Sequence, residues 1–69
     1  MIAEHSSVVL TEPLLAAGLE AGDVGGVVHV HRNGQTFEVE FMTLDGTTLS
    51  VETLTATQIR AARNRDIPH

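Results

Sequence analysis

Short runs of alternating apolar and polar residues predict that this chain folds into β-strands. The clearest run is residues 36–41, where apolar and polar side chains alternate without a break. Runs rich in β-branched residues lie at 7–11, 26–32 and 47–53, and Ile59 with its neighbours can form a brief fifth strand. The pattern therefore predicts an all-β fold of five short strands.

Two of the connections between these strands are not simple hairpin turns. After the first strand, residues 14–21 are expected to form a long ordered loop, because Gly18 and Gly22 weaken an eight-residue helix. Before the last strand, residues 55–58 are expected to form one short helical turn with a threonine near its cap position.

The first hairpin turn is predicted from the Asn-Gly pair at residues 33–34, which favours a two-residue type I′ turn. Counting outward from this turn sets Val30 opposite Phe37 and Val28 opposite Val39. Because side chains alternate along a strand, these four residues are expected to share the core face of the sheet.

The second hairpin can close in two ways, which place different residues in the core. A two-residue turn at 45–46 would set Phe41 opposite Ser50, whereas a three-residue loop at 44–46, ending in a left-handed glycine, sets Phe41 opposite Leu49. A one-residue slip would send a whole apolar set to solvent. We therefore expect the three-residue loop.

Five short strands, a long first loop, two tight hairpins and a helical turn before the last strand are the element order of a small SH3-like barrel. We expect the barrel to span residues 1–60 and a C-terminal tail to follow at 61–69. The expected core residues are Val8, Leu10, Val28, Val30, Phe37, Val39, Phe41, Leu49, Val51 and Ile59.

The composition is that of a small folded domain. Hydrophobic residues make up 42% of the 69 residues against 19% charged, and the mean hydropathy is +0.08. The absence of cysteine excludes disulfides and a zinc ribbon, and it predicts a cytoplasmic protein helped by a partner or by self-association. No apolar run approaches the roughly 18 residues of a membrane span, and residues 1–4 lack the features of a signal peptide, so no membrane contact is expected.

The charge balance argues against a protein whose main role is to hold a nucleic-acid backbone. Nine acidic residues face four arginines and no lysine, which gives a net charge of -5. Few phosphates could be neutralised by so few cations, so any such binding should be weak and sensitive to salt.

The glycine-rich segment carries two resemblances. Residues 22–28 read Gly-Asp-Val-Gly-Gly-Val-Val, which looks like the G-x-x-G-x-V pattern of SH3-like barrels of the KOW type. More closely, residues 4–60 resemble a family of short uncharacterised bacterial proteins catalogued as a domain of unknown function, through Val-Val-Leu at 8–10, Gly-Leu-x-x-Gly-Asp-x-Gly at 18–25 and the strand at 37–41. This resemblance implies a small β-barrel that accompanies another protein, and it brings no catalytic residues.

Two histidines are the nearest approach to a metal site. His29 and His31 lie two apart on one strand, so their rings share a face about 6 to 7 Å apart, with Glu38 opposite and Glu40 on the diagonal. Two imidazoles and a carboxylate suit Zn²⁺, but alternating polar residues are also the ordinary content of an open strand face. We expect a cross-strand histidine and glutamate pairing, with no bound metal or other cofactor.

The chain is predicted not to be an enzyme. Asp23 lies among glycines, where an aspartate ordinarily binds nearby backbone amides. Ser6, Ser7 and Ser50 lack the sequence frames that accompany a serine nucleophile. The nucleophile, base and oxyanion donors of a catalytic constellation are therefore not assembled.

Two groups of residues are candidates for binding a partner. The leucines of the long loop either cover the barrel or form the apolar centre of an interface. The arginines near the C-terminus form either a frayed end or a basic arm that orders on an acidic partner. These residues are Leu14, Leu15, Leu19, Arg60, Arg63 and Arg65.

Together these features favour a non-enzymatic protein-interaction module, an antitoxin-like or accessory subunit that binds a protein partner. The alternative is a weak nucleic-acid-binding domain of the KOW type. Small size without disulfides also predicts a homodimer or a hetero-complex. Sheet edges expected at the first strand and near Ile59 could then be covered by a second copy.

Overall fold

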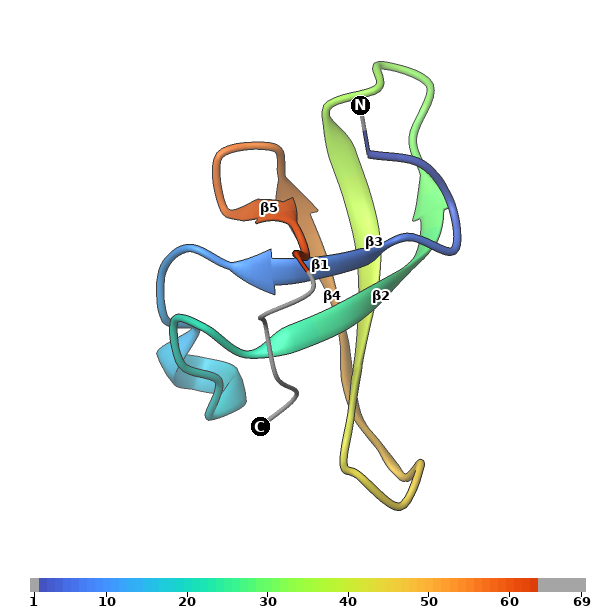
Figure 1. Cartoon of the computed structure of the whole chain (residues 1–69). Helices are drawn as coiled ribbons and strands as arrows, with labels where there is room; N and C mark the ends of the chain where they lie inside the picture. Colours follow the sequence, from blue (N-terminus) through green and yellow to red (C-terminus); the bar gives the residue numbers. More distant parts are fainter. Residues whose placement is uncertain (1, 64–69) are drawn as a thin grey trace.

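The computed structural model describes residues 2–63, which form one antiparallel sheet of five strands (Figure 1). The strands are β1 (Ser7–Leu10), β2 (Val24–Val30), β3 (Thr36–Met42), β4 (Thr48–Thr55) and β5 (Ile59–Ala61), and a 3-10 turn, η1 (Leu15–Ala17), lies in the first loop. Their order across the sheet is β4-β3-β2-β1-β5. The all-β class and the five strands are confirmed, and the long first loop lies where it was expected. The connection before the last strand is a turn at 56–58 and not the expected helical turn at 55–58, because Thr55 still belongs to β4.

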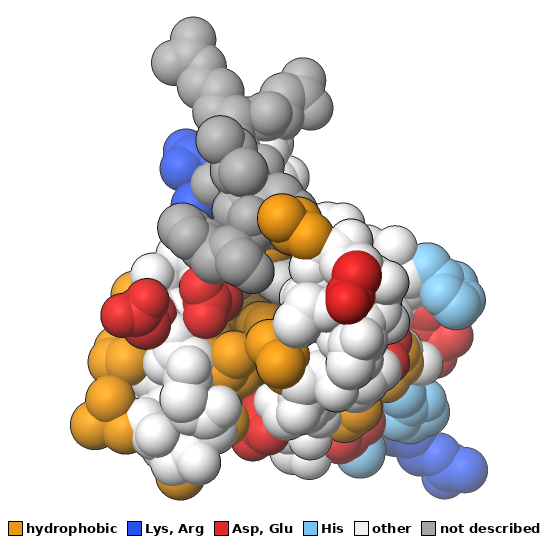
Figure 2. Space-filling view, turned by 90° about the horizontal axis from the view of Figure 1, so that it is seen from below, with side chains coloured by type: hydrophobic (Ala, Val, Ile, Leu, Met, Phe, Trp, Pro, Cys, Tyr) orange, Lys and Arg blue, Asp and Glu red, His pale blue; other side chains and the backbone are white. Residues whose placement is uncertain are grey.

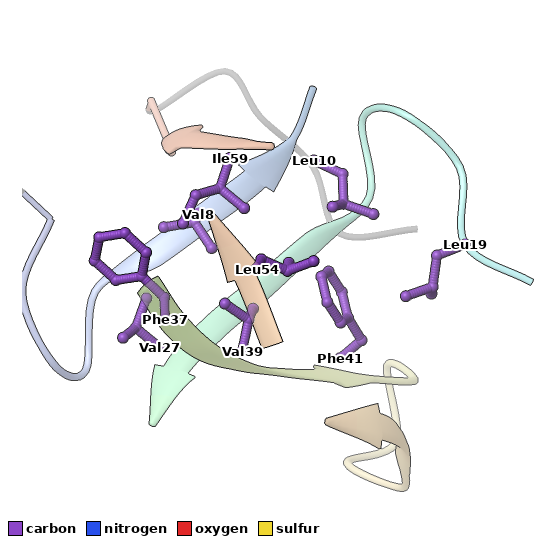
Figure 3. Close-up of a cluster of buried hydrophobic side chains, with 9 residues drawn as sticks. All are labelled: Val8, Leu10, Leu19, Val27, Phe37, Val39, Phe41, Leu54 and Ile59. Atoms are coloured by element: carbon purple, nitrogen blue, oxygen red, sulfur yellow. The ribbon is translucent and has the colours of Figure 1, made fainter. Parts of the chain in front are cut away.

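The core lies on the inner face of a curled sheet. Figure 1 shows β1 and β2 crossing in front of β3 and β4. Side chains from all four of these strands belong to one buried cluster. β3 contributes every second residue, Phe37, Val39 and Phe41, and the polar residues between them lie on the other face. The cluster, drawn in Figure 3, consists of Val8, Leu10, Leu19, Val27, Phe37, Val39, Phe41, Leu54 and Ile59.

Val28 lies outside this core because β2 contains a bulge. Close to the turn, Val30 faces Phe37 as expected, and Val30 packs against the core. Beyond the bulge Val27 faces Val39, so the expected pairing of Val28 with Val39 is wrong. Val28 is the extra residue of the bulge and its side chain is 46% exposed.

The turn between β2 and β3 is wider than the expected two-residue type I′ turn. That turn needs a positive φ at both central residues. Among residues 2–63, His5 is the one non-glycine residue with a positive φ, so Asn33 does not meet this requirement. Instead, Asn33 Oδ1 accepts hydrogen bonds from the N–H groups of Gln35 and Thr36 at 2.8 and 3.0 Å, and Gly34 takes a φ of 68°.

The turn between β3 and β4 has the expected three-residue form. Thr43 N–H donates to Thr47 O at 2.9 Å, and Gly46 has a φ of 90°. A bulge follows directly, because the pairing shifts by one residue between Phe41 and Met42. The register predicted from this loop therefore holds for the first pair of the ladder, Met42 with Thr48, and fails beyond it.

Beyond this bulge the register is the one that the sequence argument rejected, with Phe41 opposite Ser50. Leu49 is the extra residue, so the expected pairing of Phe41 with Leu49 is wrong. Leu49 and Val51 were expected in the core, but they are 57% and 52% exposed. Leu54, opposite Phe37, is the residue of β4 that joins the core.

The first loop is ordered by its own backbone, as expected. Leu14 and Leu19 exchange two hydrogen bonds, at 2.9 and 3.1 Å, around η1. Gly18 ends η1 with a φ of 71°. Leu19 is thereby turned into the core, and Leu14 packs partly against it.

The two edges of the sheet are β4 and β5. β1 lies between β2 and β5, so the edge expected at the first strand is wrong, and the one expected near Ile59 is confirmed. Residues 64–69 of the expected tail lie outside the described residues. No helix in the described part of the chain is both long enough and apolar enough to span a bilayer.

Candidate functional site

An open hollow of about 280 Å³ lies on the outer face of the sheet. Its walls come from β1, β2, β3 and the turn that follows β3, and most of them are apolar or backbone. Met42 and Leu44, which are 44% and 84% exposed, form one side. The residues that line it are Ser7, Val24, Gly25, Gly26, Glu40, Met42, Thr43 and Leu44.

The hollow exists because two adjacent glycines of β2 face opposite sides of the sheet. A Cβ atom at Gly26 would have no heavy atom within 4 Å, so the space above this residue is open. Ser7 of β1 and Glu40 of β3 flank it on the neighbouring strands. Gly25 faces the core, where a Cβ atom would lie 2.7 Å from Val39 Cγ1. Gly26 is thus the floor of the hollow, and Gly25 is a packing residue.

Glu40 supplies the negative charge of the hollow. Its half-buried side chain accepts a hydrogen bond from Thr48 Oγ1 on Oε2 at 2.6 Å, which leaves the other oxygen without a partner among the described residues. Figure 2 shows how acidic side chains lie beside hydrophobic ones on the surface seen from below. A carboxylate beside exposed apolar side chains suits a group that has an aliphatic stem and a positive end.

A second polar cluster joins β2, β3 and β4 near the other end of the outer face. His31 Nε2 lies 2.5 Å from Glu38 Oε2, and Thr53 Oγ1 donates to Glu38 Oε1 at 2.8 Å. His29 packs edge-on against His31 with ring centroids 5.0 Å apart, and its Nδ1 lies 3.6 Å from Glu4. The expected histidine and glutamate pairing is therefore made by His31, although His29 is directly opposite Glu38 in the register. Within residues 2–63, no three histidine, aspartate or glutamate side chains are placed so that they could hold a metal ion.

The hydrogen bond from His31 is the main cause of a lowered pKa at Glu38, and the bond from Thr53 is the next. Since the folded state favours the carboxylate, Glu38 contributes stability above its ordinary pKa of 4.5, and that contribution is lost as the pH falls through the lowered value. In an NMR titration we expect Glu38 to titrate below 4.5. We expect His31→Ala to raise the pKa and His29→Ala, which removes a weaker charge interaction, to raise it less. A Glu38 that titrates at its ordinary pKa in the unsubstituted protein would contradict the observed pairing.

Two aspartates, Asp23 and Asp45, serve the turns. Asp23 Oδ2 accepts a hydrogen bond from the N–H of Glu20 at 2.9 Å, which confirms that it binds a nearby amide. Asp45 accepts hydrogen bonds from Thr43 Oγ1 and from the N–H of Thr47, and these lower its pKa. Both carboxylates therefore stabilise local backbone conformations.

Comparison with known proteins identifies the family. The model of a domain of unknown function (DUF4926) matches residues 4–61. The chain belongs to this family. The expected membership of an uncharacterised family is thereby confirmed over nearly the span from which it was inferred. None of the curated proteins and none of the solved structures matched the chain.

In this DUF4926 domain the three leucines that were expected to bind a partner differ in exposure. Leu15 is 85% exposed, at the start of η1. Leu14 is half-buried and Leu19 is 4% exposed, in the core. Leu15 is thus the leucine of this loop that offers a surface to another protein.

The three arginines of the DUF4926 domain that lie within residues 2–63 are spread over its surface. Arg60 lies half-buried in β5, opposite Val9, and Arg63 is exposed two residues after the strand ends. Arg65 lies outside the described residues. Figure 2 shows basic side chains at two well-separated places, with the histidines close to one of them. Nothing in this distribution favours the nucleic-acid-binding alternative.

Sequence reasoning missed the hollow of the DUF4926 domain. Gly25 was left outside the strand expected at 26–32 and Gly26 was its first residue, yet both lie inside β2. A glycine within a strand commonly marks a close backbone approach or a missing side chain on one face. The signal was therefore the pair of glycines itself, next to the alternating acidic residues of β3.

Proposed function

We propose that this DUF4926 domain is a non-enzymatic, cytoplasmic protein-interaction module, an antitoxin-like or accessory subunit that binds a basic segment of a protein partner through the outer-face hollow. The observation that carries the proposal is the open floor at Gly26, with exposed Met42 and Leu44 on one side and Glu40 on another. Exposed apolar side chains around a concave surface are typical of interaction sites.

The chemistry of the hollow selects the kind of side chain that it takes. Lysine and arginine can lay their aliphatic stems on an apolar wall while the charged end meets a carboxylate. Here Met42 and Leu44 offer the wall and Glu40 the carboxylate. A net charge of -5 also draws a basic partner toward the domain before contact is made.

The open shape of the hollow favours a protein side chain over a cofactor. Its volume of about 280 Å³ is close to the lower end of the ~300–1,000 Å³ that is typical of pockets for drug-sized ligands and cofactors. Such ligands are also largely enclosed by their sites, whereas this hollow is open along the sheet. One side chain of a docked segment therefore fits it better than a whole small molecule.

The proposal predicts that filling the hollow or removing its charge weakens binding without unfolding the domain. In Gly26→Val, the new side chain rises from the floor into open space, and valine suits a strand. Glu40→Gln keeps an acceptor for Thr48 and removes the charge. We expect each substitution to weaken partner binding at least about tenfold, equivalent to about 1.4 kcal/mol.

The measurement is the affinity for the protein that co-purifies with the native, untagged chain, determined by calorimetry. Glu12→Gln is the matched control, since it removes the same charge as Glu40→Gln from an exposed side chain that does not line the hollow. A native chain that co-purifies with no partner, or variants at Gly26 and Glu40 that bind as tightly as the control, would count against the proposal.

A further inference from the structure

The strand β4 has a free edge with the composition of a strand that pairs with another chain. It is eight residues long and its only strand neighbour within residues 2–63 is β3. Leu49, Val51 and Thr53 are exposed along it. Edge strands are usually protected by charges, prolines or short length, and this one has a single charged residue, Glu52.

The backbone of β4 directs hydrogen-bonding groups toward this free edge. Just past the strand, Ala56 N–H donates to Gln35 O at 3.0 Å, on the side of β3, whereas Thr55 N–H donates to the side chain of Gln58. Because these groups alternate in direction along an antiparallel strand, the N–H and C=O groups of Val51 and Thr53 point away from β3. They are placed to pair with another strand.

Ser50 adds an independent observation on the same strand. Its Oγ atom is buried and has no hydrogen-bond partner. Buried hydroxyl groups in folded proteins almost always have a partner, so an unpaired one calls for an explanation. Ser50 lies on the core face opposite Phe41, and Glu52 lies on the same face opposite Val39.

We propose that a second copy of this chain pairs antiparallel along β4, with the two Val51 residues opposite each other on the two-fold axis. This register places Leu49 opposite Thr53 of the partner subunit. It also places Ser50 opposite Glu52 of the partner subunit. The Ser50 hydroxyl is buried within its own chain, so it has to rotate about χ1 toward the free edge to donate a hydrogen bond to that carboxylate.

This register avoids the repulsion that a neighbouring register would create. A two-fold axis at Glu52 would place two carboxylates opposite each other. It would also centre the pairing on a residue whose N–H and C=O groups point toward β3 and not toward the second copy. With the axis at Val51, each end of the pairing is the same by symmetry, as an isologous dimer requires. The resulting sheet continues from β5 of one copy to β5 of the other. The pairing uses the edge of β4 and does not depend on the function proposed for the hollow.

Cysteine cross-linking tests the register, because the native chain has no cysteine. Directly opposed residues in such a pair have Cα atoms about 5.5 Å apart, which is within the range of a disulfide. In Val51→Cys we therefore expect mild oxidation to convert most of the protein to a covalent dimer. Thr53→Cys is the register control, since its two copies would lie about 13 Å apart along the strands.

Sedimentation equilibrium of the unsubstituted full chain at micromolar concentration provides the second measurement. We expect the mass of a dimer, and the mass of a monomer for Val51→Lys, which would oppose two like charges on the axis. A monomer mass for the unsubstituted chain would overturn the proposal. Equal cross-linking of the two cysteine variants would overturn it as well, because the register would then be wrong.

Discussion

Leu19→Ala is expected to lower the free energy of unfolding by about 2–5 kcal/mol, the usual cost of truncating a buried leucine. Leu19 lies in the first loop, outside any strand, yet it is 4% exposed and belongs to the core cluster. A domain of this size has about 3–10 kcal/mol of stability in total, so the substitution would remove a large part of it. Urea denaturation followed by circular dichroism measures the effect.

Leu15→Ala is the matched control, because the same side chain is removed four positions earlier in the same loop. Leu15 is 85% exposed, and substitutions at such positions usually change stability by less than about 0.5 kcal/mol. Both proteins should be compared at one protein concentration, since association through β4 would add to the apparent stability. Equal losses in the two variants would mean that Leu19 does not pack in the core.

The strands could be predicted because their patterns depend on neighbours in sequence. The alternation in β3 correctly placed Phe37, Val39 and Phe41 on the core face. The pairing of Val30 with Phe37 was also correct, since it depends only on the distance from the turn. Local periodicity therefore predicted most of the sheet.

The residues predicted wrongly follow from two bulges. Each bulge inserts one residue, at Val28 in β2 and at Leu49 in β4. Every side chain beyond the bulge therefore lies on the opposite face of the sheet from the one expected for an uninterrupted strand. Apolar residues stand on both sides of each insertion, so the sequence pattern fits either register. In β4, the bulge buries Leu54 and exposes Val51, the opposite of what an uninterrupted ladder predicts.

The candidate site was hidden for the same reason. The hollow depends on Gly26 facing outward and Gly25 facing the core, and the bulge in β2 determines which of the two does so. In the register expected from the turn, Gly26 would have opposed Phe41 on the core face. Exposed residues such as Leu15 were within reach of sequence reasoning, whereas a concave surface built from three strands required the actual pairing.

Because Gly25 faces the core, Gly25→Ala is expected to lower the free energy of unfolding by about 1–3 kcal/mol. Overpacking of a filled core typically has a cost of this size. The added methyl group would lie 2.7 Å from Val39 Cγ1, 2.8 Å from Phe41 Cε1 and 3.0 Å from the carbonyl oxygen of Glu40. These distances are too short for carbon contacts, which are optimal near 3.5–4.0 Å. The core would have to expand or the strand would have to shift.

Gly26→Ala places the same methyl group one residue later, on the open floor of the hollow, where no atom lies within 4 Å. We expect this variant to be as stable as the unsubstituted protein or slightly more stable, because alanine reduces the conformational freedom of the unfolded chain. The two variants have the same composition. A difference between their free energies of unfolding, measured by chemical denaturation, therefore comes from the side of the sheet on which the added methyl group lies. If Gly26→Ala proved to be the destabilised variant, the bulge would lie on the other side of the glycine pair, and the hollow would have a different floor.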